Sequence, residues 1–383
     1  ITGSNFGPEC TGCVNAAYSS GANSYTTTCN VVGDTHGELL CSTVAGVGKD
    51  HAWVVTRSTQ SSDVSSGENG VVAYAAPTLD DTAPLSGAGV ESADTTGNQL
   101  VVIKGANFGP SAHTDITVVY GPSANTSLYS AVSCTVQSQN TIECQTVAGV
   151  GKELNWTVTI GGQASGLSIT SSAYIPPAIS GLSGDAAAVG GSTTTGGTNI
   201  TIDGDNFGPE HGETVGELEV TYGPDGTEYR ATDCVVTGQQ QIACKTQPGV
   251  GKDLKWKVSI GNQDSGVFES ETTRYANPTV DSITTGPFNT GGNQPIVING
   301  TNFGVASDPL TIPAAFFGSG TGTYSDALVS CTVTIDHVQM SCMTAAGSGK
   351  DYQVQVNVSD QRSVASSCSM PLGERYTRVC LCW

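Results

Sequence analysis

The chain has 383 residues and a formal net charge of −20, from 14 Lys and Arg against 34 Asp and Glu, and only 13% of its residues are charged. Such acidity argues against nucleic-acid binding, because phosphate contacts need clustered Lys and Arg. No apolar run approaches the ~20 residues that span a bilayer, and the composition is unlike that of a helical bundle. Ser and Thr number 87, about a quarter of the chain, beside 49 Gly. These values indicate a β protein with a weakly charged, hydroxyl-rich surface.

The sequence repeats itself four times with a period of about 100 residues. Each copy carries Gly-x-Asn-Phe-Gly, then a pair of Cys, then Gly-x-Gly-Lys, and closes on a Tyr. The first motif contains Asn5, Asn107, Asn206 and Asn302, the second ends on Lys49, Lys152, Lys252 and Lys350, and the closing residues are Tyr74, Tyr174, Tyr275 and Tyr376. This period is too long for a solenoid and indicates a tandem array of small domains.

Short alternating runs between turn residues predict β-strands, and the third copy shows them most clearly. In chain order they are residues 199–203, 218–222, 234–236, 242–244 and 254–260. The last run alternates cleanly, which places Leu254, Trp256, Val258 and Ile260 on one face, and 261–262 is Gly-Asn, typical of a hairpin turn. Six or seven such strands in about 100 residues predict an antiparallel sandwich. No segment has the 3.6-residue period of a helix.

The order of these features resembles the IPT/TIG domain, an immunoglobulin-like sandwich. Related domains occur in plexins, in the hepatocyte growth factor receptor group, in protist and algal surface proteins and beside starch-acting enzymes. The resemblance implies an all-β chain of four tandem immunoglobulin-like β-sandwich domains in residues 1–76, 77–175, 176–276 and 277–376, with 377–383 as a tail or the start of a further segment. Pro77, Pro176-Pro177 and Pro278 follow the closing Tyr of a copy, which predicts short, stiff joints.

The first and last copies depart from this pattern. Ile1 aligns with Ile103, so the first copy lacks the counterpart of residues 77–102, which should supply its opening strand. Residues 379–383 lie where a new opening strand would start, but they lack the Pro-led sequence. Two interpretations stay open: the chain is cut from a longer array, or a strand of another chain completes the first domain. This tail is one candidate for that strand, which would join protomers head to tail.

The 13 Cys indicate an oxidising, secreted compartment. Four pairs recur at the same place in each copy, and we expect a disulfide within each: Cys29/Cys41, Cys134/Cys144, Cys234/Cys244 and Cys331/Cys342. Cys10 and Cys13 form an extra C-x-x-C without the βαβ context of a redox motif, so a local disulfide is expected there too. Cys368, Cys380 and Cys382 leave one thiol that would pair between chains or outside this sequence.

The recurring motifs do not match catalytic or metal chemistry. Gly-x-Gly-Lys lacks the earlier Gly and the following Ser or Thr of a P-loop, so we interpret it as a structural loop. Asn and Gly of Asn-Phe-Gly suit a turn with positive φ, with Phe as its core anchor. Trp53, Trp156 and Trp256 share one strand position and are expected in the core rather than as sugar-stacking platforms.

Isolated ionisable residues add no site to this picture. The five His fall at unrelated positions without a Ser or Cys motif. Asp80-Asp81 and Asp203/Asp205 are candidate Ca²⁺ ligands, yet no complete ligand loop surrounds them, and a solvated face is the stronger interpretation. We therefore expect no catalytic residue, no metal and no cofactor other than attached glycans.

Five Asn-x-Ser/Thr sequons predict N-glycosylation, at Asn125, Asn155, Asn199, Asn299 and Asn357. We expect at least three to be occupied, and Ser/Thr runs such as 61–66 and 193–195 are candidates for O-linked sugar. A glycan coat would keep a Lys-poor surface soluble and would hinder pairing of sheet edges.

Repetition without a chemical site favours a structural role. Our first hypothesis is a secreted, glycosylated tandem-domain protein that forms or contributes to a filament, surface coat or appendage and self-associates head to tail or laterally. The alternatives are the ectodomain stalk of a cell-surface receptor or adhesin, and the non-catalytic stalk of a carbohydrate-active enzyme. No nucleic acid and no membrane span are expected in this segment.

Overall fold

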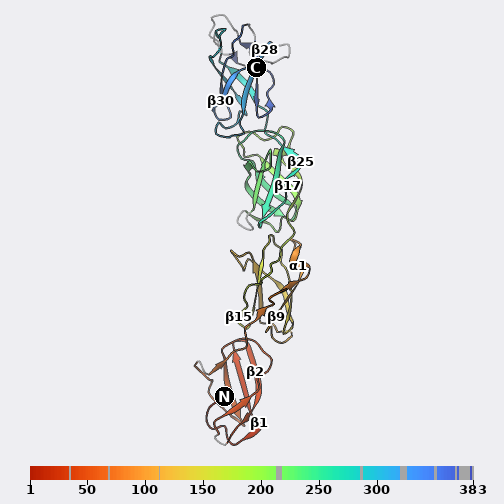
Figure 1. The fold of residues 1–383 in the computed structure, drawn as a ribbon, viewed down its shortest axis with the longest axis vertical. Helices are drawn as coiled ribbons and strands as arrows, with labels where there is room; N and C mark the ends of the chain where they lie inside the picture. Colours follow the sequence, from red (N-terminus) through yellow and green to blue (C-terminus); the bar gives the residue numbers. More distant parts are fainter. Residues whose placement is uncertain are drawn as a thin grey trace. The chain divides into compact units, whose positions relative to one another are not determined.

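The computed structural model describes residues 1–33, 36–67, 70–111, 113–212, 218–284, 288–319, 326–348, 352–366, 369–370 and 380–381. The chain forms two compact units, Ile1–Ile175 and Pro176–Trp383. Each unit contains two repeats, which we name by their strands (Figure 1). The first repeat holds β1–β6, the second β7–β15, the third β16–β25 and the fourth β26–β35.

The second repeat is a sandwich of two antiparallel sheets. One has the strand order β11-β10-β14-β15, and the other has β12-β13-β9-β7 with β8 also paired to β9. The bounds are β7 (Thr78–Leu79), β8 (Leu85–Ser86), β9 (Leu100–Ala106), β10 (Ile116–Gly121), β11 (Tyr129–Ser130), β12 (Val132–Ser138), β13 (Thr141–Gln145), β14 (Asn155–Ile160) and β15 (Gln163–Ala164). Val101, Ile103 and Trp156 are fully buried in one cluster, so the core lies between the sheets.

The third repeat has the same two-layer plan, with sheets β16-β17-β22-β21-β18 and β20-β19-β23-β24, and with β25 paired to β23. Its strands are β16 (Ala178–Ser183), β17 (Asn199–Asp205), β18 (His211–Gly212), β19 (Glu219–Gly223), β20 (Tyr229–Arg230), β21 (Thr232–Gly238), β22 (Gln241–Lys245), β23 (Leu254–Ile260), β24 (Gln263–Asp264) and β25 (Phe268–Thr273).

The fourth repeat follows with sheets β30-β31-β27-β26-β35 and β29-β28-β32-β33, and with β34 paired to β32. Its strands are β26 (Thr279–Ile283), β27 (Pro295–Thr301), β28 (Pro313–Ser319), β29 (Asp326–Ala327), β30 (Val329–Ile335), β31 (Gln339–Met343), β32 (Tyr352–Val358), β33 (Gln361–Arg362), β34 (Ser369–Met370) and β35 (Cys380–Leu381).

Alternation of apolar residues sets the faces of these strands. In β23 the four residues predicted on one face are at most 1% exposed, while the intervening residues are partly exposed. Gly261 and Asn262 turn the chain with φ of 56° and 62°, which continues β23 into β24 as a two-residue hairpin. Helix is limited, in the described part of the chain, to α1 (Ala88–Glu91) and the 3₁₀ turn η1 (Asp185–Ala187). The predicted all-β sandwich class is confirmed.

The first repeat differs because its strands form one continuous sheet, β3-β2-β1-β4-β5, with β6 paired to β4. The strands are β1 (Cys10–Ser20), β2 (Asn23–Val31), β3 (Leu39–Cys41), β4 (His51–Arg57), β5 (Gln60–Ser61) and β6 (Val71–Val72). In the second and third repeats, Gly-Pro at 121–122 and 223–224 ends β10 and β19, because Pro cannot continue the ladder. The first repeat turns instead through Gly21-Ala22, so β2 runs unbroken and pairs with both β1 and β3.

The first residue of the chain pairs with the edge strand β3. The Ile1 ammonium donates to the Leu39 carbonyl at 2.8 Å, and the Leu39 amide donates to the Ile1 carbonyl at 2.8 Å. No described residue of the first repeat forms a counterpart of the opening strands β7, β16 and β26. Phe6 is consequently partly exposed, whereas Phe108, Phe207 and Phe303 are fully buried.

Among the described residues, five disulfides cross-link neighbouring backbone segments within the repeats. They join Cys10 to Cys13, Cys29 to Cys41, Cys134 to Cys144, Cys234 to Cys244 and Cys331 to Cys342. In the second to fourth repeats the first Cys lies in a bulge of its strand, after a residue with φ of 52°: Ser133, Asp233 and Ser330. Cys368 and Cys382 lie outside the described residues, as does the side chain of Cys380.

Removing one of these bonds tests how much they stabilise a sandwich. The Cys234→Ala, Cys244→Ala double variant is expected to lose about 2–3 kcal/mol, because the bond closes a 10-residue separation in the unfolded chain. Urea unfolding of the oxidised full chain measures this. A matched pair at exposed positions, Ser86→Ala with Ser130→Ala, should change stability by no more than about 0.5 kcal/mol. Equal stability of the two double variants would contradict the expectation.

The tail pairs with its own chain. β35 lies antiparallel to the opening strand β26, with Cys380 opposite Ile283 and Leu381 opposite Ser282. Thus the free side of an opening strand accepts one further strand, and in this structure the tail supplies it to the fourth repeat.

Candidate functional sites

The loop that contains Gly-x-Gly-Lys forms the tip of a repeat, and tyrosine hydroxyls hold it. In the second repeat the Val150 amide donates to the Tyr129 hydroxyl at 3.0 Å, and this hydroxyl donates to the Val150 carbonyl at 2.9 Å. Tyr25 holds Val47 and Tyr229 holds Val250 in the same way. A fixed peptide fixes the direction of the valine side chain, so this residue is presented as a rigid knob.

Two further tyrosines hold the other side of each tip. Tyr222 and Tyr275 share a hydroxyl–hydroxyl hydrogen bond of 2.7 Å, Tyr275 donates to the Gln247 carbonyl, and the Gln247 amide donates to Tyr222. The pairs Tyr18/Tyr74 and Tyr120/Tyr174 repeat this arrangement at Val44 and Val147. The closing Tyr of the sequence pattern is therefore a support of the tip loop.

Val47 of the first repeat enters the next repeat. It is 3% exposed and belongs to the core cluster of the second repeat. It lies against Gly109 of the Asn-Phe-Gly turn, where an added Cβ would overlap a Val47 methyl. Gly109 also has φ of 84°, so glycine is required there both by its conformation and by the docked valine.

The second unit contains the same joint. Val250, 1% exposed, belongs to the core cluster of the fourth repeat and lies against Gly304, which has φ of 79°. Two contacts are added here. The Asp308 carboxylate lies 3.0 Å from the Tyr229 hydroxyl and shares its one proton with the Val250 carbonyl, and the Thr194 hydroxyl bonds to the His337 ring at 2.9 Å.

A glutamine clamps each of these two joints. The Gln163 amide donates to the carbonyl of Tyr74 at 3.2 Å, and Gln361 makes the same contact with Tyr275 at 2.6 Å. Gln361 also accepts the Gly251 amide at 3.2 Å. Gln163 starts β15 and Gln361 starts β33, each directly after a hairpin turn. Each glutamine therefore ties the hairpin turn of its own repeat to the tip of the preceding repeat.

The Asn of Asn-Phe-Gly binds the linker between repeats. Its side-chain nitrogen donates to the carbonyl of Ala76 from Asn107, of Pro176 from Asn206 and of Asn277 from Asn302, at 3.0, 3.3 and 3.1 Å. The structure confirms that these Asn and Gly residues have positive φ. It adds a role that turn chemistry did not predict, because Asn-Phe-Gly and Gly-x-Gly-Lys are the two halves of one joint.

The sequence held a signal for this joint. Valine stands between the two glycines in three copies, and a Gln recurs at positions 60, 163, 263 and 361, three residues after the end of the same strand motif. A solvent-exposed loop does not need a recurring valine.

The tryptophans lie in the core as predicted. Trp156 and Trp256 are fully buried and stack on Tyr120 and Tyr222 with ring centroids 4.2 and 4.3 Å apart. Their indole nitrogens donate to Ser172 and Thr273. A buried, hydrogen-bonded indole cannot serve as a platform for a sugar.

The five sequons differ in their surroundings. Asn125 is exposed in the loop between β10 and β11, and Asn199 is exposed at the first position of β17. Asn155 and Asn357 lie within β14 and β32 and are partly buried, and the Asn357 side-chain oxygen is buried without a hydrogen-bond partner. Asn299 donates to Ser282 at 3.1 Å and accepts from Gln339 at 2.9 Å, so both ends of its amide are occupied inside the sheet.

Glycan mapping should follow this order of exposure. In protein secreted from a eukaryotic host, Asn125→Gln and Asn199→Gln should each remove one N-glycan mass, because both amides face solvent. Asn299→Gln should leave the mass unchanged apart from the substitution itself. Intact-mass spectrometry before and after enzymatic deglycosylation checks this, and a glycan found on Asn299 would contradict it.

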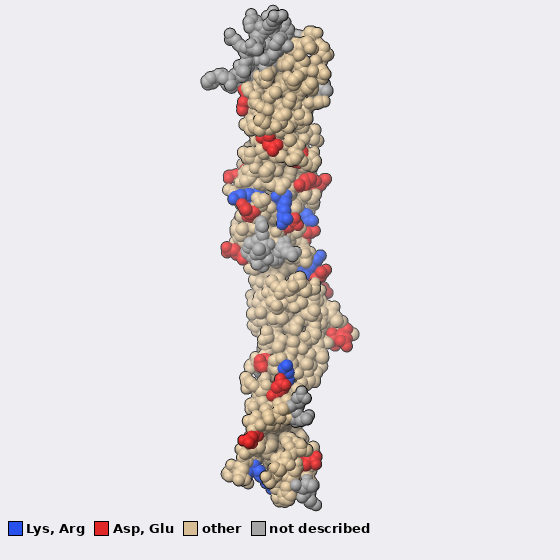
Figure 2. Space-filling view, turned by 90° about the vertical axis from the view of Figure 1, so that its left-hand side faces the viewer, with Lys and Arg blue, Asp and Glu red and all other residues tan. Residues whose placement is uncertain are grey.

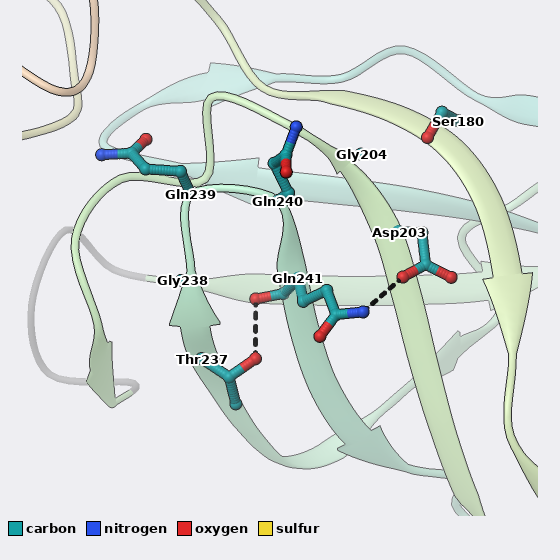
Figure 3. A pocket seen from close by; sticks show the side chains of 8 residues that line it. All are labelled: Ser180, Asp203, Gly204, Thr237, Gly238, Gln239, Gln240 and Gln241. Carbon is teal, nitrogen blue, oxygen red and sulfur yellow. Dashed lines mark hydrogen bonds between the residues drawn. The ribbon is translucent and has the colours of Figure 1, made fainter.

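A polar hollow of about 460 Å³ lies on the third repeat (Figure 3). Gln239, Gln240 and Gln241 line it from the β21–β22 turn, with Ser180 on β16 and Asp203 on β17. Asp203 accepts Gln241 at 2.8 Å and Ser183 at 2.9 Å, and Asp205 accepts Gln240 at 3.2 Å. Amide, hydroxyl and carboxylate groups of this kind can bind a polyhydroxylated ligand, although each carboxylate already has a protein donor.

The acidic residues proposed for Ca²⁺ have such donors as well. Asp80 accepts the Thr82 amide and hydroxyl and the Ala83 amide, and these hydrogen bonds, led by Ala83, lower the pKa of its carboxyl to about 2. In the described segments, no three His, Cys, Asp or Glu residues are grouped as metal ligands would be.

Charge is distributed unevenly over the surface. On the face shown in Figure 2, Lys and Arg gather mainly over the third repeat, while wide areas elsewhere carry no charge. Three ion pairs lie on the β19-β23 sheet of that repeat: Arg230–Glu219, Lys255–Glu269 and Lys257–Asp264. All are substantially exposed and contribute little to stability.

Disulfide-linked repeats and docked tips define a tandem array of immunoglobulin-like domains. A model of the IPT/TIG domain matches residues 89–174, 190–275 and 278–371, well over half of the sequence. The chain therefore belongs to the IPT/TIG domain family. No curated protein matches it. Among the described residues, no helix is long and apolar enough to cross a membrane.

Several solved structures are similar to the chain. The plexin A4 extracellular region is 12% identical, with 95% of this chain and 45% of that chain covered and a TM-score of 0.24. Invasin, a bacterial integrin-binding protein, is 14% identical over 97% and 74%, with a TM-score of 0.23. A surface glycan-binding protein from Prevotella bryantii is 13% identical over 51% and 41%, with a TM-score of 0.31. The chain spans less than half of the plexin chain, and likeness at this level says nothing about ligands.

Proposed function

We propose that the chain is a non-catalytic, glycosylated structural protein of the cell exterior, which forms or contributes to a filament, surface coat or appendage. One observation carries this proposal: the same joint of valine knob, glycine socket and glutamine clamp recurs in both units. Docked joints transmit position and force from one domain to the next, which free linkers do not.

The composition supports the same role. Disulfides stabilise small domains in an oxidising exterior. The three buried tyrosines of the third repeat serve the joint with the fourth rather than a catalytic centre, since their hydroxyls bind backbone groups of the tip loop. A tandem array that acts as a structural spacer needs repeated domains and no unique chemical site.

Immunogold electron microscopy of the native cells tests this. Antibodies against the chain should label filaments, a coat or an appendage outside the cell. Labelling confined to the interior, or to dispersed soluble particles, would refute the proposal.

The hollow on the third repeat favours a second candidate, the stalk of a receptor or adhesin. The carboxylate of Asp203 distinguishes this repeat, since Lys104 replaces it in the second and Asn299 in the fourth, whereas Gln241 has a counterpart in Gln339. Glycan-array binding by the full chain that is lost in Gln241→Ala would support this role. Binding unchanged by that substitution would exclude the hollow as the glycan-binding site.

A further inference from the structure

The outer face of the β20-β19-β23-β24 sheet is charged, unlike the corresponding face of the second repeat. Its charged side chains form three ion pairs: Glu219 with Arg230, Lys255 with Glu269 and Lys257 with Asp264. The β11-β10-β14-β15 sheet of the second repeat has uncharged residues at the corresponding strand positions, among them Thr117, Ser130, Thr157 and Ala164. The pattern of charges is therefore not a general feature of the repeat.

The strand register arranges four of these side chains in two rows across the sheet. Glu219 on β19 and Asp264 on β24 pair with the same residue of β23, so they form an acidic row. Arg230 on β20 and Lys257 on β23 both pair with Thr221, so they form a basic row. The two rows are two residues apart along β19, which is about 7 Å.

Stability of the fold does not account for these charges. The three ion pairs of this face span 3.7, 3.1 and 2.8 Å and lie at the surface, where an ion pair adds little to folding. Their charges balance, whereas the chain as a whole has a net charge of −20. Two copies of so acidic a chain repel each other over most of their surface, and a balanced face is where they can approach.

This face also lacks a predicted glycan. The sequons at Asn155 and Asn357 lie on the equivalent strands β14 and β32 of the second and fourth repeats. Lys255 and Ser259 stand at these two positions in the third repeat. The sequence thus predicts no N-linked sugar over the two charged rows.

We propose that this face of the third repeat is a lateral contact surface for the same face of a second copy of this chain. A two-fold axis between the two faces, parallel to the rows and midway between them, places the acidic row of each copy over the basic row of the other. The partner's Glu219 then lies between Arg230 and Lys257. This inference rests on the proposed structural function and names a contact by which copies would join side by side.

The two rows also determine the direction of the partner. The axis parallel to the rows reverses the strands, so the two third repeats pack with their strands antiparallel. A two-fold axis along the strands would instead place acid over acid and base over base, which is unfavourable. The charge pattern therefore selects one of the two symmetric ways to stack the sheets.

Sedimentation velocity of the full chain at increasing concentration tests the inference, at about 0.1 M salt, where the Debye length of about 10 Å screens distant charges. The unmodified chain should associate, and Lys257→Glu should weaken association about tenfold or more. Lys245→Glu is the matched control, because Lys245 is also paired to an aspartate, Asp233, but lies on β22 in the other sheet. It should leave association unchanged.

A charge exchange tests the pairing of the rows. The double variant Glu219→Lys, Asp264→Lys has two basic rows, and Arg230→Glu, Lys257→Glu has two acidic rows. Each alone should stay monomeric, and an equal mixture of the two should associate at least as strongly as the unmodified chain. A mixture of the basic variant with the unmodified chain should associate more weakly than this, since only one of its two row contacts is then attractive.

A chain that stays monomeric at every concentration overturns the inference, as do equal effects of Lys257→Glu and Lys245→Glu or a charge-exchanged mixture that stays monomeric. If a double variant fails to fold, the two single variants decide. Failure here leaves the proposed function standing when immunogold labelling still marks extracellular structures, which then assemble through another surface. Labelling confined to the interior refutes the proposed function even when the chain associates in solution.

Discussion

Val250→Asp should unfold the joint of the second unit and destabilise the fourth repeat. The aspartate would place a carboxylate in a cluster with Phe303, Ala315 and Val356, where the native side chain is 1% exposed. A charge buried without a partner costs several kcal/mol, so the expected loss is about 3 kcal/mol or more. Differential scanning calorimetry of the full chain should show the transition of the fourth repeat shifted down and separated from the rest.

The chain supplies a matched control at the same loop position. Ser348→Asp introduces the same carboxylate into the tip of the fourth repeat, where residue 348 is exposed. Its unfolding should change by no more than about 0.5 kcal/mol. Similar losses from both variants would show that the tip loop tolerates no carboxylate anywhere, and that docking of Val250 is not the cause.

The strands and turns of the repeats could be predicted because they depend on local chemistry. The alternation in residues 254–260 and the Gly-Asn pair that follows determine face and hairpin without reference to distant residues. The unbroken β2 does not follow from the sequence in this way. The first repeat lacks the Gly-Pro that ends β10, but so does the fourth, whose β28 and β30 still lie in different sheets.

The joint could not be predicted in the same way. Val250 and Gly304 are 54 residues apart and belong to different repeats, and no local pattern brings them together. Gln361 is a polar residue after a hairpin turn, a position that normally faces solvent, and only the docked tip of the neighbouring repeat buries it to 4% exposure. The sequons show the same limit, because a motif cannot reveal that Ser282 and Gln339 occupy the amide of Asn299.

Raising the pH above 10 should unfold the repeats that contain the tyrosine cluster. Burial raises the pKa of Tyr222 to about 12 and also raises the pKa of Tyr275 and Tyr229. A raised folded-state pKa gives stability that is complete below the unfolded value near 10 and is lost as the pH rises toward the folded value. For Tyr222 alone this amounts to about 2–3 kcal/mol, and the tip loop would be released with it. Urea midpoints between pH 8 and 12, followed beside tyrosinate absorbance, measure the loss.

Tyr222→Phe separates this titration from other alkaline effects. The ring that stacks on Trp256 is kept, while the hydroxyl that binds Gln247 and Tyr275 is removed. The variant should be less stable at pH 8 by about 1–2 kcal/mol, because it leaves the Gln247 amide without that acceptor. It should then lose less stability per pH unit above 10 than the unmodified chain. An unchanged slope, with disulfides verified intact on non-reducing gels, would mean that Tyr222 does not couple ionisation to unfolding. In that case the tip loop would owe its alkaline sensitivity to other groups.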